Sequence, residues 1–177
     1  MAYRRLEQDV DLFRFYGKII QKRLRLRGIN VSQEEAEARM LGRRKNGEPL
    51  VHNLSGIKPD DRDKAINFNY NDDRDGAQCP LASHIRKVNP RGSSVAGPND
   101  YKKNIVRRTI LYGNKLKREP VGLLFLCYQS ALDQGFLVQQ FGSNSETFGE
   151  SPPPRVGLDM VIGQRVFIRH LLSATNR

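Results

Sequence analysis

The sequence predicts an α+β fold, in which helices pack against an antiparallel sheet. Apolar residues recur with a helical period over residues 10–24, and two strand-like runs follow one another at 104–112 and 121–128. A long irregular segment separates these patterns, and a last strand candidate covers residues 164–170. The predicted order, β-α-(α-loop)-β-β-α-β, is that of a ferredoxin-like fold with a large insertion. A chain of 177 residues is long enough for one such domain with its own core.

The N-terminal region contains the clearest local signals. A short strand is expected over residues 3–7, followed by a helix that Asp9 caps. The apolar residues of this helix fall near one face: Val10, Phe13, Ile20 and Leu24. A second helix is expected to begin at Ser32, because Glu35 completes a capping-box pattern, and to end at Gly42.

The segment from residue 43 to about residue 104 has little periodicity and much Gly, Pro, Asn and Asp. A loop of this length in a compact domain is usually either functional or disordered. Embedded apolar and aromatic residues, such as Leu50, Phe68 and Tyr70, favour an ordered excursion wrapped around something.

Residues 79–91 (Cys-Pro-Leu-Ala-Ser-His-Ile-Arg-Lys-Val-Asn-Pro-Arg) are the densest part of that excursion. They hold His84, three cations and two prolines without a regular apolar period. Because Pro80 and Pro90 would disrupt the interior of a helix or a strand, we expect a loop here. It is either a basic surface loop or a rigid loop that holds His84 for a ligand.

The two adjacent strands differ in how their side chains alternate. Residues 104–112 place Arg107 on the same face as Ile105 and Leu111, which is unusual for a solvated cation. In residues 121–128, Leu123 and Phe125 alternate with other leucines, so both faces are apolar. A sheet with helices on one face only should alternate more cleanly. We therefore expect a second domain, a cofactor, or both against the other face.

The C-terminal part is expected to contain one more helix. Ser130 with Asp133 predicts its start, and the pattern runs to about Phe141. A loop rich in Gly, Ser and Pro then spans residues 142–157.

Charge and composition limit the class of protein. The chain is 38% hydrophobic, with a mean hydropathy of -0.61. It has no apolar run of membrane-helix length and no signal-peptide pattern. We therefore expect a cytoplasmic protein without a membrane partner. Cys79 and Cys127 are too far apart in sequence to suggest a zinc site or a disulfide framework. The net charge of +11 fits solvated faces, nucleic acid, an acidic protein or an acidic cofactor such as haem.

RNA recognition is the nucleic-acid alternative, since RNA-recognition domains share this order of strands and helices. Residues 121–128 keep a glycine, Phe125 and Tyr128 of their signature strand, but lack its leading cation. Leu123 also replaces the first stacking aromatic. An apolar core strand explains the run better, and nucleic acid is disfavoured as a partner.

Several motifs, in matching order and spacing, resemble the haem domain of dye-decolourising (DyP-type) peroxidases. They are Phe68-Asn-Tyr70, the whole of residues 79–91, residues 107–113 and residues 122–129. Residues 5–10, 40–50 and 157–164 extend the resemblance over nearly the whole chain. It implies the C-terminal, haem-binding half of such an enzyme, which is one half of a dimeric α+β barrel.

The resemblance also implies a cofactor and site residues. Haem b is the expected cofactor, with His84 as the proximal iron ligand and Asp159 as the carboxylate on its other ring nitrogen. Arg107 matches the distal arginine, which would polarise peroxide and stabilise charge as the O–O bond breaks. Leu123 and Phe125 are expected to line the haem pocket. The alternatives are that Asp159 is an ordinary loop aspartate, and that Arg107 is a plain strand cation. Leu123 and Phe125 could equally be plain core residues.

The implied reaction is reduction of hydrogen peroxide, followed by one-electron oxidation of an organic donor. The family's distal aspartate lies in a Gly-x-x-Asp-Gly motif, whereas Asp75-Gly76 is the single Asp-Gly pair here and position 72 is Asp. We therefore expect one C-terminal peroxidase domain over residues 1–177, without the N-terminal ferredoxin-like domain and impaired in peroxide cleavage. The rival hypotheses are a non-catalytic remnant, a subunit that needs a separate N-terminal half or another copy of the chain, and a basic RNA-binding module.

Overall fold

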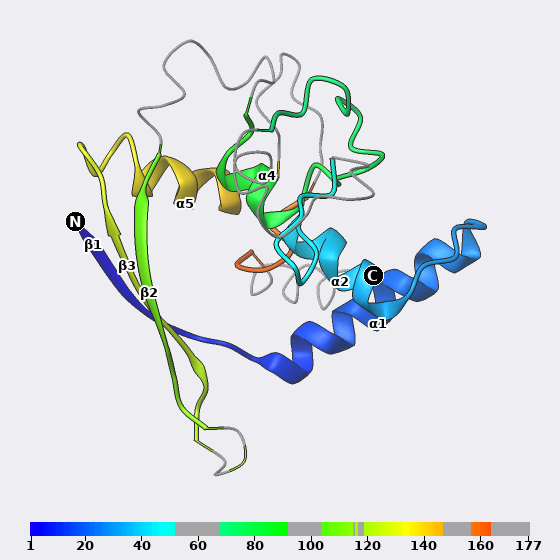
Figure 1. The fold of residues 1–177 in the computed structure, drawn as a ribbon, viewed down its shortest axis with the longest axis horizontal. Coiled ribbons are helices and arrows are strands. Elements are labelled where there is room, and N and C mark those ends of the chain that lie inside the picture. The colour runs from blue at the N-terminus through cyan, green and yellow to red at the C-terminus, as the bar shows by residue number, and fades with distance from the viewer. Residues whose placement is uncertain (52–67, 92–103, 115, 117–118, 147–156, 164–177) are drawn as a thin grey trace, which may run out of the picture.

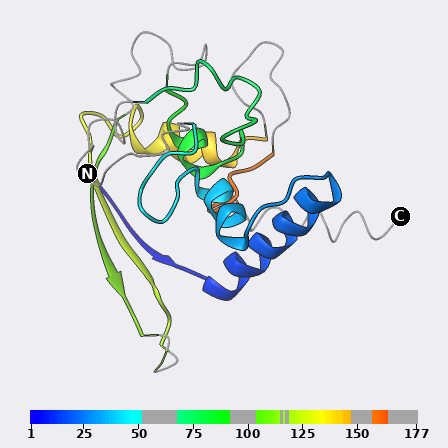
Figure 2. The same cartoon turned by 45° about the vertical axis from the view of Figure 1, so that its right-hand side comes forward.

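The computed structural model describes residues 1–51, 68–91, 104–114, 116, 119–146 and 157–163. Figures 1 and 2 both show a curved sheet beside a group of helices, from which α1 extends away. The elements in chain order are β1 (Ala2–Glu7), α1 (Val10–Leu26), α2 (Gln33–Leu41), α4 (His84–Val88), β2 (Val106–Tyr112), β3 (Gly122–Tyr128) and α5 (Phe136–Asn144).

The sheet has three strands in the order β1-β3-β2, and β3 runs antiparallel to both neighbours. This is the inner part of a ferredoxin-like sheet, in which β3 is inserted between two strands that run in the same direction. The order agrees with the predicted α+β fold. The last strand candidate, residues 164–170, lies outside the described residues.

The strand register determines which side chains share a face. Arg107 pairs with Cys127, Thr109 with Phe125, and Leu111 with Leu123. Because directly opposite residues point to the same side, Arg107, Leu123 and Phe125 lie on one face. Phe125 packs on Phe136 of α5, with ring centroids 6.1 Å apart, so this face is turned toward α5.

The opposite face of the sheet is open in the described part of the chain. Tyr3 is 58% exposed and Ile110 is 67% exposed, although both are large and apolar. Leu124 and Leu126 of β3 point to this face. The described elements do not cover them densely, so both remain half-buried.

Both N-terminal helices begin where the sequence predicts, and α2 also ends at the predicted residue. The Asp9 carboxylate accepts the backbone N–H of Leu12, and the Ser32 hydroxyl accepts that of Glu35. Gly42 ends α2 with a positive φ of 90°, and a Cβ there would lie 2.4 Å from the side chain of Ile85. Glycine at position 42 thus allows both the left-handed turn and the close approach of α4. No helix in the described ranges combines the length and apolar character needed to cross a bilayer.

Two of the predicted boundaries were wrong. Residues 84–88 form the helix α4 where we expected a loop, because Pro80 and Pro90 flank this five-residue helix and do not interrupt it. Ser130 precedes a turn at residues 132–135 that contains Asp133, and α5 starts only after Gly135, whose backbone (φ -98°, ψ -94°) is not helical. The helix then continues to Asn144, beyond the predicted end at Phe141.

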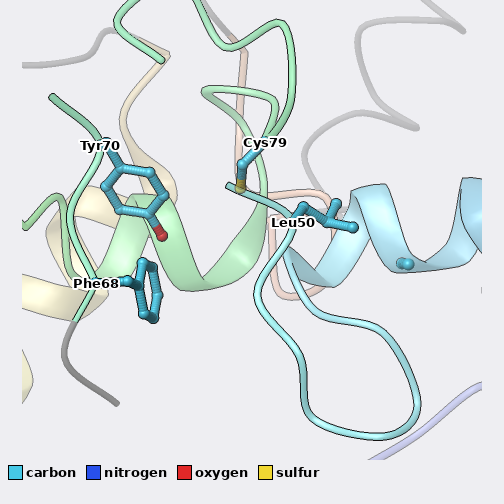
Figure 3. Packing of buried hydrophobic residues seen from close by; sticks show 5 residues of the cluster. Leu50, Phe68, Tyr70 and Cys79 are labelled. Atoms are coloured by element: carbon cyan, nitrogen blue, oxygen red, sulfur yellow. The ribbon is translucent and has the colours of Figure 1, made fainter. Parts of the chain in front are cut away.

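A small apolar core joins α2 to the irregular segment that follows it (Figure 3). Its buried members are Ala38, Leu50, Phe68, Tyr70 and Cys79. The Phe68 and Tyr70 rings meet edge to face, with centroids 5.5 Å apart. This core is modest, so polar contacts must help to determine how the segment folds.

Arg86 of α4 supplies the main polar contacts. Its side chain is 1% exposed and donates to the Asp73 carboxylate (2.8 Å), the Asp73 carbonyl (2.6 Å) and the Cys79 carbonyl (2.7 Å). The guanidinium also lies over the Tyr70 ring, 4.5 Å from its centroid. The Asp73 carboxylate in turn accepts the backbone N–H groups of Gln78 and Cys79. Residues 70–79 are thus wrapped around α4 by one buried ion pair and its hydrogen bonds.

We predict that Asp73→Ala lowers the free energy of unfolding by about 3–5 kcal/mol, because it leaves the Arg86 charge buried without its carboxylate. Urea unfolding followed by circular dichroism measures the effect. Glu34→Ala is the matched control, since it breaks the exposed Lys45–Glu34 pair and should cost at most about 1 kcal/mol. Equal losses in the two variants would contradict the prediction.

Candidate functional site

His84 is the first residue of α4, and its side chain is 22% exposed. Its ring nitrogen Nδ1 lies 2.8 Å from Oδ2 of Asp159, a residue 75 positions later in the chain. The Asp159 side chain is completely buried. The structure thus brings together two of the residues that the sequence singled out. Their role toward a cofactor stays a prediction.

The turn that carries Asp159 holds its carboxylate in place. Oδ1 accepts the backbone N–H groups of Val161 (2.8 Å) and Ile162 (3.0 Å). The backbone N–H of Asp159 donates to the Ser143 carbonyl in α5, and that of Met160 donates to the Ala82 carbonyl just before α4. These bonds fix the carboxylate relative to both helices.

The electrostatics of Asp159 determine the proton arrangement in the pair. Burial alone would raise the pKa of this carboxyl, but the hydrogen bond from His84 and the two backbone N–H groups outweigh burial and hold the pKa below its usual value. The carboxylate is therefore ionised at neutral pH and accepts the hydrogen of Nδ1. In a neutral imidazole with its hydrogen on Nδ1, the lone pair of Nε2 is available for a ligand.

Lys87 ties the other end of α4 to α5. Its side chain is buried, and Nζ donates to the Ser145 carbonyl at 2.6 Å. Burial lowers the pKa of this ammonium group, and the nearby Asp159 charge partly offsets the shift. The first residue of α4, His84, is thus anchored to the Asp159 turn, and Lys87 near its other end is anchored to Ser145, directly after α5.

The remaining candidates lie on the sheet. Leu123 and Phe125 are half-buried on the face turned toward α5, and Arg107 is an exposed residue of the same face. Burial is the main cause that lowers the pKa of Arg43, and the positive charges of Arg91 and Arg107 add to it. The five predicted site residues thus fall into two sets. His84 and Asp159 are joined by a hydrogen bond, and Arg107, Leu123 and Phe125 share a face of the sheet.

The sequence reasoning missed a cluster of cations and aromatic rings. The guanidinium groups of Arg43 and Arg91 lie 5.2 Å and 4.4 Å from the centroid of the same Phe68 ring. Phe68, Tyr70 and Arg91 belong to motifs that we quoted without assigning them a role. Their spacing along the chain gives no local sign that they meet, so only the recurrence of Arg and aromatic residues in those motifs could have suggested it.

Comparisons with known proteins identify the family. The model of the C-terminal part of Dyp-type peroxidases matches residues 17–148. The multifunctional dye peroxidase DyP2 of Amycolatopsis sp. is 35% identical over 179 residues, which cover 92% of this chain and 38% of that protein. The dye-decolorizing peroxidase of Exidia glandulosa is 33% identical over 195 residues, which cover 93% of this chain and 36% of that protein. This chain thus spans well under half the length of these relatives.

Solved structures give the same result. The structure of DyP2 from Amycolatopsis sp. aligns with a TM-score of 0.75 at 32% identity, covering 91% of this chain and 37% of that one. A dye-decolorizing peroxidase in complex with 2,6-dimethoxyphenol aligns with a TM-score of 0.73 at 32% identity, covering 92% of this chain and 41% of that one. These structures confirm the predicted α+β fold class.

The family also bears on the cofactor. DyP-type peroxidases bind haem, so the prediction of haem as the cofactor is confirmed at the level of the family. The family model, the sequence relatives and the solved structures agree with one another. The chain belongs to the dye-decolourising (DyP-type) peroxidase family and corresponds to the C-terminal part of its members.

Proposed function

We propose that this chain is the haem-ligating part of a peroxidase and that His84 ligates the haem iron through Nε2. The contact of 2.8 Å between Nδ1 of His84 and Asp159 is the observation that carries this proposal. A ligating histidine typically donates its other ring N–H to a carboxylate, which fixes the tautomer and raises the basicity of the ligand. Asp159 is buried and ionised, as that role requires.

The residues present fit such a group. The His84 side chain is 22% exposed, which leaves a ligand access to the ring, and Asp159 holds the ring at Nδ1. Leu123 and Phe125 offer an apolar surface on the sheet face turned toward α5. The net charge of +11 also suits an acidic cofactor. When bound, haem supplies the electron transfers that reduce hydrogen peroxide and oxidise an organic donor.

Arg107 is the proposed catalytic residue of this chain. A guanidinium stays charged at any physiological pH and can stabilise negative charge that develops on a reacting oxygen. Arg107 shares a face with the proposed pocket residues Leu123 and Phe125. Its exposure leaves room for a ligand or for further protein around the guanidinium.

Proton transfer to peroxide needs another group. The printed sequence has no Gly-x-x-Asp-Gly motif, which carries the acid in the family that the sequence resembles. We therefore infer that haem binding and peroxide turnover are separable in this chain. Full activity would require an acid group from protein that carries such a motif, as the N-terminal half of a relative would. The open sheet face that bears Tyr3 and Ile110 is available for such a partner.

The first test is the iron ligand. The purified chain titrated with haem should develop a Soret band, and His84→Gly should shift or abolish it because the ligating nitrogen is gone. Added imidazole should restore the band by occupying the vacated position. Gln134→Ala, at an exposed site, is the control and should titrate like the wild type. An unchanged spectrum in His84→Gly would overturn the assignment, and salt-dependent RNA binding without haem uptake would favour an RNA-binding module.

The second test concerns Asp159. Asp159→Asn keeps the shape of the side chain but removes the charge that polarises His84, so the iron–histidine stretching band should move to lower frequency. Haem affinity should fall by about 10- to 100-fold, the usual cost of losing such a partner. Resonance Raman spectra and optical titrations measure the two effects. An unmoved stretching band would show that Asp159 is only a structural anchor.

A third test addresses turnover. The haem-loaded chain alone should oxidise 2,6-dimethoxyphenol with peroxide about 100-fold or more slowly than a full-length relative, because a positioned acid–base group typically contributes that much. Adding an N-terminal half of a relative that carries Gly-x-x-Asp-Gly should raise the rate. Turnover at the level of the full-length relative by the chain alone would refute the inferred separation.

A further inference from the structure

Lys87 is a buried cation that lies about one helical turn after His84 on α4. Only 5% of this residue is exposed, although lysine is almost never buried unless it is paired. Residues three positions apart lie on the same face of a helix, so the Lys87 side chain leaves α4 on the side of His84. Figures 1 and 2 show α4 and α5 side by side, and the two helices pack against each other.

The end of α5 brings the Lys87 ammonium group to the turn that carries Asp159. Nζ of Lys87 donates to the Ser145 carbonyl at 2.6 Å, and the backbone N–H of Asp159 donates to the Ser143 carbonyl at 3.0 Å. A Cβ on Gly142 would lie 3.0 Å from the Lys87 carbonyl, so the backbones of the two helices also approach closely here. The buried cation and the Asp159 turn are therefore held at the same helix end.

The opposite charges of Lys87 and Asp159 act on each other. Burial lowers the pKa of the Lys87 ammonium group, and the Asp159 charge raises it again in part. The negative end of the α5 dipole, to which the Ser145 carbonyl belongs, also favours the charged form. Because the Asp159 side chain is completely buried, solvent screens this attraction only weakly. The same carboxylate binds Nδ1 of His84 at 2.8 Å, so it is shared between the ring and a buried positive charge.

From this arrangement we propose that Lys87 is a positioning residue that reduces how strongly Asp159 polarises His84. The inference rests on the proposed haem function, in which Nε2 of His84 ligates the iron. A carboxylate on the other ring nitrogen raises the basicity of such a ligand, and a cation near that carboxylate weakens the effect. Removing the Lys87 charge should therefore make His84 a stronger donor, which is the opposite of what the loss of Asp159 does.

The decisive experiment replaces Lys87 by methionine in the haem-loaded chain. Methionine fills the volume of the lysine stem without its charge. The iron–histidine stretching band should move to higher frequency, and the reduction potential of the haem should fall, because a more basic ligand favours ferric iron. If Lys87 only tied α4 to α5, its loss would loosen the His84–Asp159 contact and move the band to lower frequency. A band that does not move, or that moves to lower frequency, overturns the proposal.

Two further variants separate the charge of Lys87 from its hydrogen bond to Ser145. Lys87→Arg keeps the charge and should leave the band near its wild-type frequency. Lys87→Gln keeps an N–H donor without the charge, so it should move the band in the same direction as Lys87→Met, and it replaces that variant if methionine prevents folding. Lys18→Met removes an exposed cation of α1 and is the matched control, which should shift neither the band nor the potential. Thermal melts of the apo chains verify folding.

A double-mutant cycle tests whether Lys87 acts through Asp159. In the Asp159→Asn background, Lys87→Met should move the band much less than it does in the wild type, because the carboxylate that the lysine offsets is gone. Equal shifts in the two backgrounds would show that Lys87 acts on the haem directly, and the proposal would then be wrong.

The failures of the two proposals are distinguishable. If the wild-type chain takes up no haem, or if uptake does not depend on His84, the proposed haem function fails and the role of Lys87 falls with it. If uptake depends on His84 but neither Lys87→Met nor Lys87→Gln moves the band to higher frequency, the haem function stands and the role of Lys87 alone is refuted.

Discussion

The buried ion pair between Arg86 and Asp73 is the interaction on which the rest of this structure depends. The apolar core is small, so the irregular segment that follows α2 cannot be held by burial of side chains alone. Arg86 compensates by donating to the side chain and the carbonyl of Asp73 and to the carbonyl of Cys79. A buried charge pair contributes little net stability unless its polar groups are hydrogen-bonded, and here both terminal nitrogens of Arg86 donate to oxygens of the wrapped segment. The main effect of the Arg86–Asp73 pair is therefore to fix the position of α4.

The position of α4 in turn fixes His84 from two sides. On the α2 side, the Ser83 hydroxyl donates to the Arg39 carbonyl, and Ile85 packs where Gly42 has no side chain. On the α5 side, Lys87 and the Asp159 turn both bond to the carbonyls at the end of that helix. The His84 ring thus has its Nδ1 edge pinned and its Nε2 edge directed away from these contacts. That is the preorganisation that a ligand site needs.

The sequence predicted those features that depend on short-range chemistry. Asp9 and Ser32 cap the helices after them, and the alternation along β2 put Arg107 on the face of Leu111, which the observed register then matches to the face of Leu123 and Phe125. The sequence did not predict the helix α4. Five residues between prolines are too few to show a helical period, and this helix is stabilised by the contact of Arg86 with another segment, at Asp73. The His84–Asp159 pair joins residues 75 positions apart, so only the family resemblance indicated it. The Arg43–Phe68–Arg91 cluster was missed for the same reason.

The two sets of site residues differ in how firmly the chain itself holds them. His84 and Asp159 are enclosed by α4, α5 and the turn at 157–163, with backbone hydrogen bonds on the carboxylate. Arg107 stands exposed on a strand, and an exposed guanidinium loses side-chain entropy whenever it must hold one catalytic position. In the function that we propose, ligation would need only the first set, whereas peroxide cleavage would need the second set held in register with an acid. The described contacts therefore hold the proposed iron ligand more firmly than the proposed catalytic arginine.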